Sequence, residues 1–504
     1  METHNYFSTA EETFGAMKEF LQSPASFRLA LSRLEDRLSN DGRELLRQLL
    51  LAHLACRGVG DIGLSVVGAD GITRTHKRVR PRTITTLFGA ITIQRQAYSM
   101  PHVGSLFPLD AMLNLPPINV SYTLQKHFVL EVIKDSFQEA IDTVARWTGM
   151  TITKDHALDI VQEAVQDFST FYAVRCRRER LEAEPLPLLI LTADGKGVLV
   201  RTEDLRPATR KRAAQRAAKR GAEPDTTPRR HARRMATVAS AYEVGRFVRT
   251  PEDIVDAFFP TQEPPSRRRP LPKAKRLWAS LKDSPDLIIE ELLKDALRRD
   301  PAQKKDWVVL VDGDPHQIAR FRRLAKAYHV HLTLICDIVH VLGYLWKAAA
   351  VLRQAEEQVA AWVRERLHRI LLGKSSAVAA GMRRSATCRQ LTTTVREPVD
   401  ACARYLLNHA PYLAYHEYLK QGYPIATGVI EGACRYLVKD RMELTGARWS
   451  LAGAEAVLKL RAVKVSGDFS DYWAFYEQQQ FERIYKPLYQ NPLVLTFGST
   501  CKED

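Results

Sequence analysis

Two aspartates in this sequence each follow an apolar run and precede a glycine. Asp194 comes directly after residues 187–193, and Asp312 comes directly after residues 307–311. An apolar run of this length, bounded by turn residues, predicts a buried strand, and glycine permits a tight bend at its end. Both carboxylates are therefore expected at the edge of a sheet. A third carboxylate, Glu431, stands near the first turn of a predicted helix.

Carboxylates in such a group suit divalent metal ions. Oxygen ligands are preferred by Mg²⁺ and Mn²⁺, and two ions about 3.5–4 Å apart can drive an in-line phosphoryl displacement. Each carboxylate also has a plainer interpretation, because strand-end aspartates cap turns and Asp-Gly is a common turn dipeptide. Asp314 competes with Asp312, and we prefer Asp312 because it directly ends the apolar run.

The composition indicates a globular protein with an anionic partner. A length of 504 residues predicts two to four domains, while 45% hydrophobic and 26% charged residues are ordinary values. The net charge of +16 favours nucleic acid first and an anionic membrane surface second. The seven cysteines include no Cys-x-x-Cys pair, which indicates reduced intracellular thiols. We expect a cytoplasmic protein, because no signal peptide or stretch of roughly 20 apolar residues is present.

One basic segment, residues 206–234, contains almost no acidic residues. Charge runs are usually solvated faces, but a run this one-sided in a basic protein favours contact with phosphate. Its candidate nucleic-acid-binding residues are Arg210, Lys211, Arg212, Arg216, Lys219, Arg220, Arg229, Arg230, Arg233 and Arg234.

The first part of the chain is predicted to be mostly helical. Residues 1–70 form a helical region with a turn at Ser39–Gly42. Residues 71–180 combine a β-hairpin around Gly89 with a helix-turn-helix outline around Gly149. A stretch of basic residues, from Arg74 to Arg82, leads into the hairpin and either contacts phosphates or forms a solvated rim. The helices either read DNA or are a simple helical hairpin.

The remaining regions predict a mixed α/β core interrupted by helices. Residues 181–342 alternate strands and helices, including a strand at 235–244, a proline-rich loop at 250–275 and a strand ending at Asp337. An all-helical insertion follows at 343–420, the final helices of the core at 421–466, and an aromatic covering tail at 467–504.

Several motifs of the chain resemble one family, the ISKra group of bacterial insertion-sequence transposases. The similarity runs from about Phe107 to Trp473 and is most specific near its C-terminal end. The motifs that carry it are Leu191–Gly197, Val311–Gly313, Thr427–Arg435, Lys439–Glu443 and Thr445–Ser450.

The resemblance implies a DDE transposase, which cuts DNA and joins the freed 3′-end to a target. It implies a ribonuclease-H-like catalytic core, two Mg²⁺ or Mn²⁺ ions, and Asp194, Asp312 and Glu431 as the catalytic and metal-binding triad. Asp337–His340 resembles the Asp/Cys-x-x-His element of the related Mutator-like transposases, so His340 joins the expected catalytic residues; the alternative is a turn and helix cap. Paired cysteines for zinc are missing, so no zinc is expected. The implied partner is double-stranded DNA, both element ends and target, bound by a homodimer or larger assembly.

Four residues of the C-terminal block are further candidates for DNA contact: Lys439, Arg441, Arg448 and Trp449. Arginine suits phosphate and tryptophan can stack on an unpaired base, although Trp449 suits a buried core position equally well. Three other functions remain open: a nuclease or resolvase of the same fold, a non-catalytic DNA-binding protein derived from a transposase, and a phosphate-handling metabolic enzyme. The last fits the carboxylates but not the basic segment.

Overall fold

The computed structural model describes residues 5–178, 186–218, 233–260, 268–352 and 356–490. The chain divides into two compact units. Unit 1 comprises Met1–Asp167 with Phe469–Asp504, and unit 2 comprises Phe168–Asp468. The predicted catalytic regions therefore belong to unit 2, and the covering tail belongs to unit 1.

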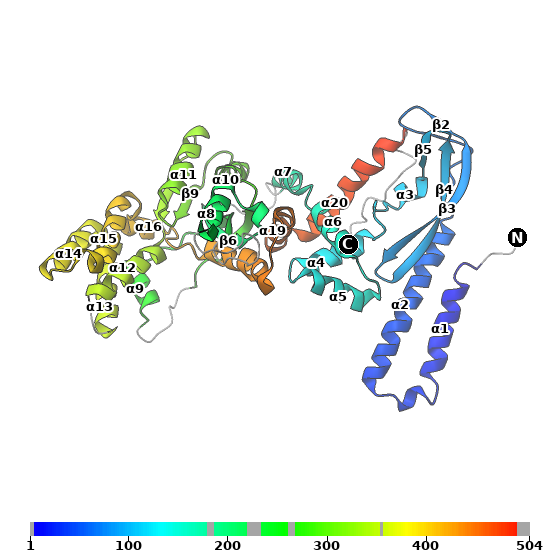
Figure 1. Ribbon diagram of the computed structural model, residues 1–504, viewed down its shortest axis with the longest axis horizontal. Helices are drawn as coiled ribbons and strands as arrows, with labels where there is room; N and C mark the ends of the chain where they lie inside the picture. Colours follow the sequence, from blue (N-terminus) through cyan, green and yellow to red (C-terminus); the bar gives the residue numbers. More distant parts are fainter. Residues whose placement is uncertain (1–4, 179–185, 219–232, 261–267, 353–355, 491–504) are drawn as a thin grey trace. The chain divides into compact units, whose positions relative to one another are not determined.

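Unit 1 begins with two long helices that lie side by side, α1 (Ser8–Leu21) and α2 (Leu31–Cys56), after which the chain enters its first sheets (Figure 1). The prediction of a turn at Ser39–Gly42 was wrong, because α2 runs through these residues without interruption. An ion pair between Arg37 and Asp41 spans one helical turn at this point, and such pairs support a helix over residues of poor helix propensity.

The predicted β-hairpin is confirmed and is longer than expected. β3 (His76–Thr86) pairs with β4 (Gly89–Met100), which pairs with β5 (Val103–Leu106) in an antiparallel sheet. A separate short pair joins β1 (Val66–Val67) to β2 (Thr73–Arg74). Gly89 has a φ of +117°, a conformation that glycine adopts without strain at the hairpin turn.

Four shorter helices and a returning C-terminal helix complete unit 1. They are α3 (Pro108–Met112), α4 (Tyr122–Val132), α5 (Phe137–Thr148), α6 (Lys154–Glu163) and α20 (Phe469–Ile484). Gly149 ends α5 in the left-handed conformation, and Thr153 caps α6 by accepting a hydrogen bond from the His156 amide. The helices of the predicted helix-turn-helix outline are therefore present. Tyr476 of α20 packs edge-on against Tyr122, so this helix of the aromatic tail packs within unit 1.

Unit 2 contains a five-stranded sheet in the order β10-β9-β6-β7-β8. The strands are β6 (Leu188–Leu199), β7 (Arg233–Val244), β8 (Lys273–Ser280), β9 (Asp306–Val311) and β10 (Thr333–Cys336). β6, β9 and β10 are parallel, whereas β7 runs antiparallel to both of its neighbours. In chain order the sheet reads 3-2-1-4-5 with only the second strand reversed, and the predicted mixed α/β class is confirmed.

Two local predictions in this sheet were wrong. The proline-rich stretch at 250–275 is not all loop: Thr250 forms a capping box for α9 (Pro251–Phe258), and β8 begins at Lys273. The chain also does not bend after Asp194, because β6 continues through Gly195 and Gly197. A Cβ atom at Gly197 would come within 3.0 Å of the Arg233 side chain on β7, so this glycine serves cross-strand packing.

Helices surround and interrupt the sheet of unit 2. Those before the insertion are α7 (Phe168–Arg178), η3 (Thr202–Asp204), α8 (Pro207–Ala218), α10 (Pro285–Arg299) and α11 (Pro315–Ala327). The predicted helical insertion is confirmed as α12 (Ile338–Leu352), α13 (Glu356–Leu371), α14 (Ser375–Cys388), α15 (Thr393–Asn408), η4 (Ala410–Tyr412) and α16 (Tyr415–Lys420). Val309 of β9 and Leu345 of α12 belong to one buried cluster, so the insertion shares the core of the sheet.

The chain then returns to the sheet through α17 (Gly428–Ala433), a π-helical segment (Cys434–Lys439), α18 (Asp440–Met442), η6 (Leu444–Gly446) and α19 (Leu451–Val465). Among the described residues, the helices are too short or too polar for any of them to cross a membrane.

Candidate active site

Two of the predicted carboxylates occupy matching positions on neighbouring strands. β6 and β9 run parallel, and their register pairs Thr192 with Leu310, so two residues further along each strand Asp194 matches Asp312. Adjacent strands lie about 4.8 Å apart, so residues in matching positions are direct neighbours, here with Asp194 inside β6 and Asp312 directly after β9. The sequence predicted both strands, and the register brings their two aspartates together.

A third aspartate continues this row. The parallel register of β10 and β9 pairs Cys336 with Val311, so Asp337 matches Asp312 one residue further on. The Asp337 amide donates to the Val311 carbonyl at 2.8 Å, which extends the ladder to this position. Asp194, Asp312 and Asp337 thus stand on three neighbouring strands.

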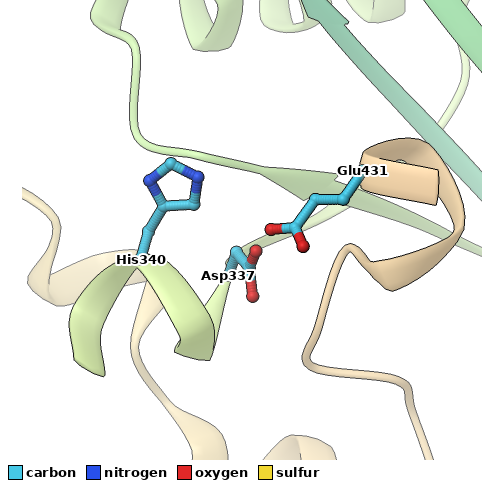
Figure 2. A group of neighbouring side chains, drawn as sticks. All are labelled: Asp337, His340 and Glu431. Atoms are coloured by element: carbon cyan, nitrogen blue, oxygen red, sulfur yellow. The ribbon is translucent and has the colours of Figure 1, made fainter. Parts of the chain in front are cut away.

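Glu431 lies beside this row and does not face away from it. One ligand atom each from Asp337, His340 and Glu431 lies within 4.8 Å of the other two. Figure 2 shows Glu431 reaching from α17 toward Asp337 and His340 at the start of α12. Asp337 is buried, whereas His340 and Glu431 are exposed. Asp194 and Asp312 are not members of this close group.

The orientation of Asp337 is fixed by hydrogen bonds to both carboxylate oxygens. The Val339 amide donates to Oδ1 at 2.8 Å, and the Thr427 hydroxyl donates to Oδ2. The bond to Val339 caps α12, so the helix-cap interpretation of this motif is correct as far as Asp337 is concerned. Burial raises the pKa of Asp337 even though these bonds favour its charged form.

The helix that carries Glu431 also touches Asp194. The Cys434 Sγ donates to Asp194 Oδ2 at 3.4 Å, and burial together with the Asp194 charge raises the pKa of this thiol. At Cys434 the helix widens into a π-helical segment, a feature common at functional sites. Arg461 donates to the Leu437 carbonyl at 2.8 Å and so satisfies an acceptor of this irregular segment.

The turn after Asp312 is held by the helical insertion. Tyr405 on α15 donates to the Asp312 carbonyl at 2.9 Å, and His409 Nε2 lies 2.8 Å from the Gly313 carbonyl. The Tyr405 ring stacks on Tyr344 with centroids 4.4 Å apart. The insertion is therefore tied directly to the backbone that presents Asp312.

Replacing Tyr405 with phenylalanine should loosen this contact while keeping the packed ring. We expect Tyr405→Phe to lower the free energy of unfolding by about 1 kcal/mol, the usual value of one hydrogen bond. Urea unfolding measures this loss, and Tyr418→Phe serves as a control at another buried tyrosine of the same insertion, one that donates no hydrogen bond to the Asp312 turn. An unchanged midpoint for Tyr405→Phe would show that the bond adds nothing.

The donor set fits divalent cations. Asp194, Asp312, Asp337 and Glu431 gather at one edge, and within the described ranges no lysine or arginine forms an ion pair with any of them. Clustered carboxylates repel one another unless a cation compensates them. Four carboxylates suit Mg²⁺ or Mn²⁺, and the imidazole of His340 is more favourable to Mn²⁺ than to Mg²⁺.

The predicted basic segment is described only in part. Arg210, Lys211 and Arg212 are exposed on α8. Arg216 lies on the same helix, but its side chain is outside the described part of the structure, and so are residues Lys219, Arg220, Arg229 and Arg230.

The two remaining arginines of that segment are engaged within the protein. Arg233 pairs with Glu443 at 2.5 Å and keeps an exposed side chain. Arg234 donates to the carbonyls of Leu281 and Asp204, each at 2.8 Å, and desolvation by burial lowers its pKa. Arg234 is thus a structural residue, an arrangement that does not support its predicted DNA contact.

The C-terminal candidates divide in the same way. Lys439 and Arg448 are exposed. Arg441 is 2% exposed and stacks on Trp449, whose indole donates to the Met442 carbonyl at 3.0 Å. The core interpretation of Trp449 is correct, and this burial does not support DNA contact by Arg441 or Trp449.

Sequence reasoning left Asp337 and Cys434 out of the site. Asp337 ends an apolar run just as Asp312 does, and that signal was available. Cys434 gave no signal, because its approach to Asp194 depends on how α17 packs against β6.

Comparison with known proteins does not assign this chain to a family. No family model matches the chain, and no characterised protein matches it significantly.

Proposed function

We propose that this chain is a DDE transposase, which uses divalent metal ions to cut DNA and to transfer the freed strand to a target. The observation that carries the proposal is the matching position of Asp194 and Asp312 on parallel neighbouring strands, with the Glu431 helix against Asp194. Carboxylates converging from distant parts of a chain are the ligand set of two-metal phosphoryl transfer. Mg²⁺ or Mn²⁺ is the proposed cofactor.

The connectivity of unit 2 supports the proposal. A sheet of chain order 3-2-1-4-5 with the second strand reversed is the arrangement of a ribonuclease-H-like core. The helices α12 to α16 separate β10 from α17, as the resemblance implies for a helical insertion before the glutamate. We therefore propose a ribonuclease-H-like catalytic core in unit 2.

Each residue has a distinct part in the proposed reaction. Asp194, Asp312 and Glu431 would hold the metal, and the buried Asp337 would complete the negative edge and orient His340 through the start of α12. When bound, the ions would activate the attacking oxygen and stabilise the leaving one. His340, exposed beside Glu431, is in position to exchange a proton with solvent or with DNA.

The proposed partners follow from charge and from the reaction. The exposed Arg210, Lys211 and Arg212 of α8, with Lys439 and Arg448, offer cations for the phosphates of double-stranded DNA. We also propose that the protein works in the cytoplasm as a homodimer or larger assembly that bridges two DNA ends.

A strand-transfer assay tests this function. End-labelled DNA carrying the element's ends is incubated with protein and supercoiled target in Mg²⁺, Mn²⁺ or EDTA, and products are resolved on denaturing gels. A transposase joins labelled ends to the target in either metal and loses this activity in EDTA. Cleavage without joined product indicates a nuclease or resolvase, and DNA binding without cleavage indicates a non-catalytic protein.

A further inference from the structure

The edge strand of unit 1 carries arginines that the proposed active site does not use. Residues His76 to Pro81 of β3 are six consecutive exposed positions, so both faces of the strand are open there. Side chains alternate between faces, which puts His76, Arg78 and Arg80 on one face and Lys77 and Val79 on the other. We call His76, Arg78 and Arg80 the basic strip.

The two faces differ in how their charges are compensated. Lys77 donates to Asp61 at 2.5 Å, so the charge on its face is neutralised. In the described residues neither Arg78 nor Arg80 forms an ion pair. The positive charge that is left therefore gathers on the face of the basic strip.

The neighbouring strand does not compensate Arg80. Arg80 stands directly opposite Arg95 of β4, whose own charge is paired with Asp110. Asp110 is also paired with Arg82, and among the described residues it forms no ion pair with Arg80. An exposed guanidinium group without a carboxylate partner can bind an external anion.

The backbone of the strand argues against a protein strand as that partner. Among the described residues, the outer edge of β3 has backbone partners only at Thr85, where Asn119 and Ser121 close it. Pro81 has no amide hydrogen, and proline with charged side chains is the pattern that blocks strand addition. Guanidinium groups suit phosphate oxygens in particular, because they can donate two parallel hydrogen bonds.

We propose that the basic strip of unit 1 contacts the phosphate backbone of double-stranded DNA. This inference rests on the proposed function, since it assumes that the chain binds DNA, and it assigns part of that binding to β3. Arg78 and Arg80, about 6.8 Å apart along the strand, each neutralise one phosphate.

Salt-dependent binding tests the strip separately from catalysis. Affinity for a random-sequence duplex is measured by fluorescence anisotropy in EDTA for the full chain and for Arg78→Ala/Arg80→Ala. Each lost phosphate contact makes the salt slope shallower by about 0.9. The ratio of wild-type to variant affinity should therefore fall about twelvefold between 50 and 200 mM salt.

Two variants control for charge and folding. Arg33→Ala/Lys77→Ala removes two positive charges from unit 1 that are already paired with Asp36 and Asp61, and it should keep the wild-type slope. Arg78→Lys/Arg80→Lys retains the charge and should keep most of the slope, whatever its effect on affinity.

Three outcomes would overturn the assignment. Equal slopes for wild type and Arg78→Ala/Arg80→Ala mean that the strip meets no phosphate, and an acidic protein is then the better partner. Aggregation of that variant with unchanged DNA affinity means that the arginines only protect an open strand edge. A wild-type chain that binds no duplex rejects the DNA partner and the proposed function together, whereas a normal strip result with no strand transfer rejects the catalytic proposal alone.

Discussion

Replacement of Asp194 by asparagine should abolish strand transfer while leaving DNA binding nearly unchanged. The side chain keeps its shape but loses the negative charge that a metal ligand at this position supplies. Loss of several kcal/mol of metal-dependent stabilisation corresponds to roughly 10³-fold or more in rate. Rates come from the strand-transfer assay and affinities from anisotropy with the same duplex.

The stability of this variant separates a functional residue from a structural one. Asp194 stands at an edge with three other carboxylates and no described ion pair, so its neutralisation relieves repulsion. We expect the thermal midpoint of Asp194→Asn to equal or exceed that of the wild type without metal. A variant that transfers strands at near the wild-type rate would refute the assignment of Asp194.

Asp314→Asn is the matched control for the same chemical change. Asp314 is exposed, and its carboxylate caps α11 by accepting from the His316 amide at 3.1 Å. Asparagine is an equally good cap, so stability and activity should stay close to wild type. Loss of activity here would make Asp314, rather than Asp312, the ligand after β9.

The sequence was sufficient to predict the aspartate-bearing strands because the signal for each is local. The apolar runs before Asp194 and Asp312 are continuous, and both fold as buried strands. The row that includes Asp337 depends on strand register, a non-local property that no single run of residues encodes.

Two further differences between the predictions and the structure also arise because local residue types do not determine the structure alone. β8 was missed because its buried residues follow a stretch in which prolines are frequent, and proline normally indicates a loop. The predicted DNA contact of Arg441 rested on residue type, but its place between buried elements is set by packing against Trp449. Charge alone does not distinguish an arginine that stacks inside a core from one that faces solvent.

Replacement of Gly313 by alanine should have the second large effect, because two independent constraints apply to this residue. Its φ is +96°, which an alanine adopts only with strain. A Cβ atom would lie 2.7 Å from Cε2 of Tyr405, closer than real Cβ contacts. Tyr405 cannot easily yield, since its ring stacks on Tyr344 and packs against His409 at 4.3 Å.

The strain in Gly313→Ala should therefore move the turn that presents Asp312. We expect unfolding free energy to fall by about 1–3 kcal/mol. Strand transfer should fall by roughly 10²-fold, since a displacement of about 1 Å in a reacting group has that effect. Urea unfolding and the strand-transfer assay measure the two losses, and DNA affinity should not change.

Gly467→Ala separates backbone strain from displacement of the site. Gly467 has a similar φ of +84°, and nothing lies within 4 Å of its added Cβ atom. This variant should lose stability through strain alone and keep its activity in the folded state.

In Gly313→Ala/Tyr405→Ala the obstructing ring is gone, so the combined loss of stability should be smaller than the sum of the single losses. Additive losses, or full activity in Gly313→Ala, would mean that the insertion does not set the position of Asp312, and the contact from α15 would then be a matter of packing only.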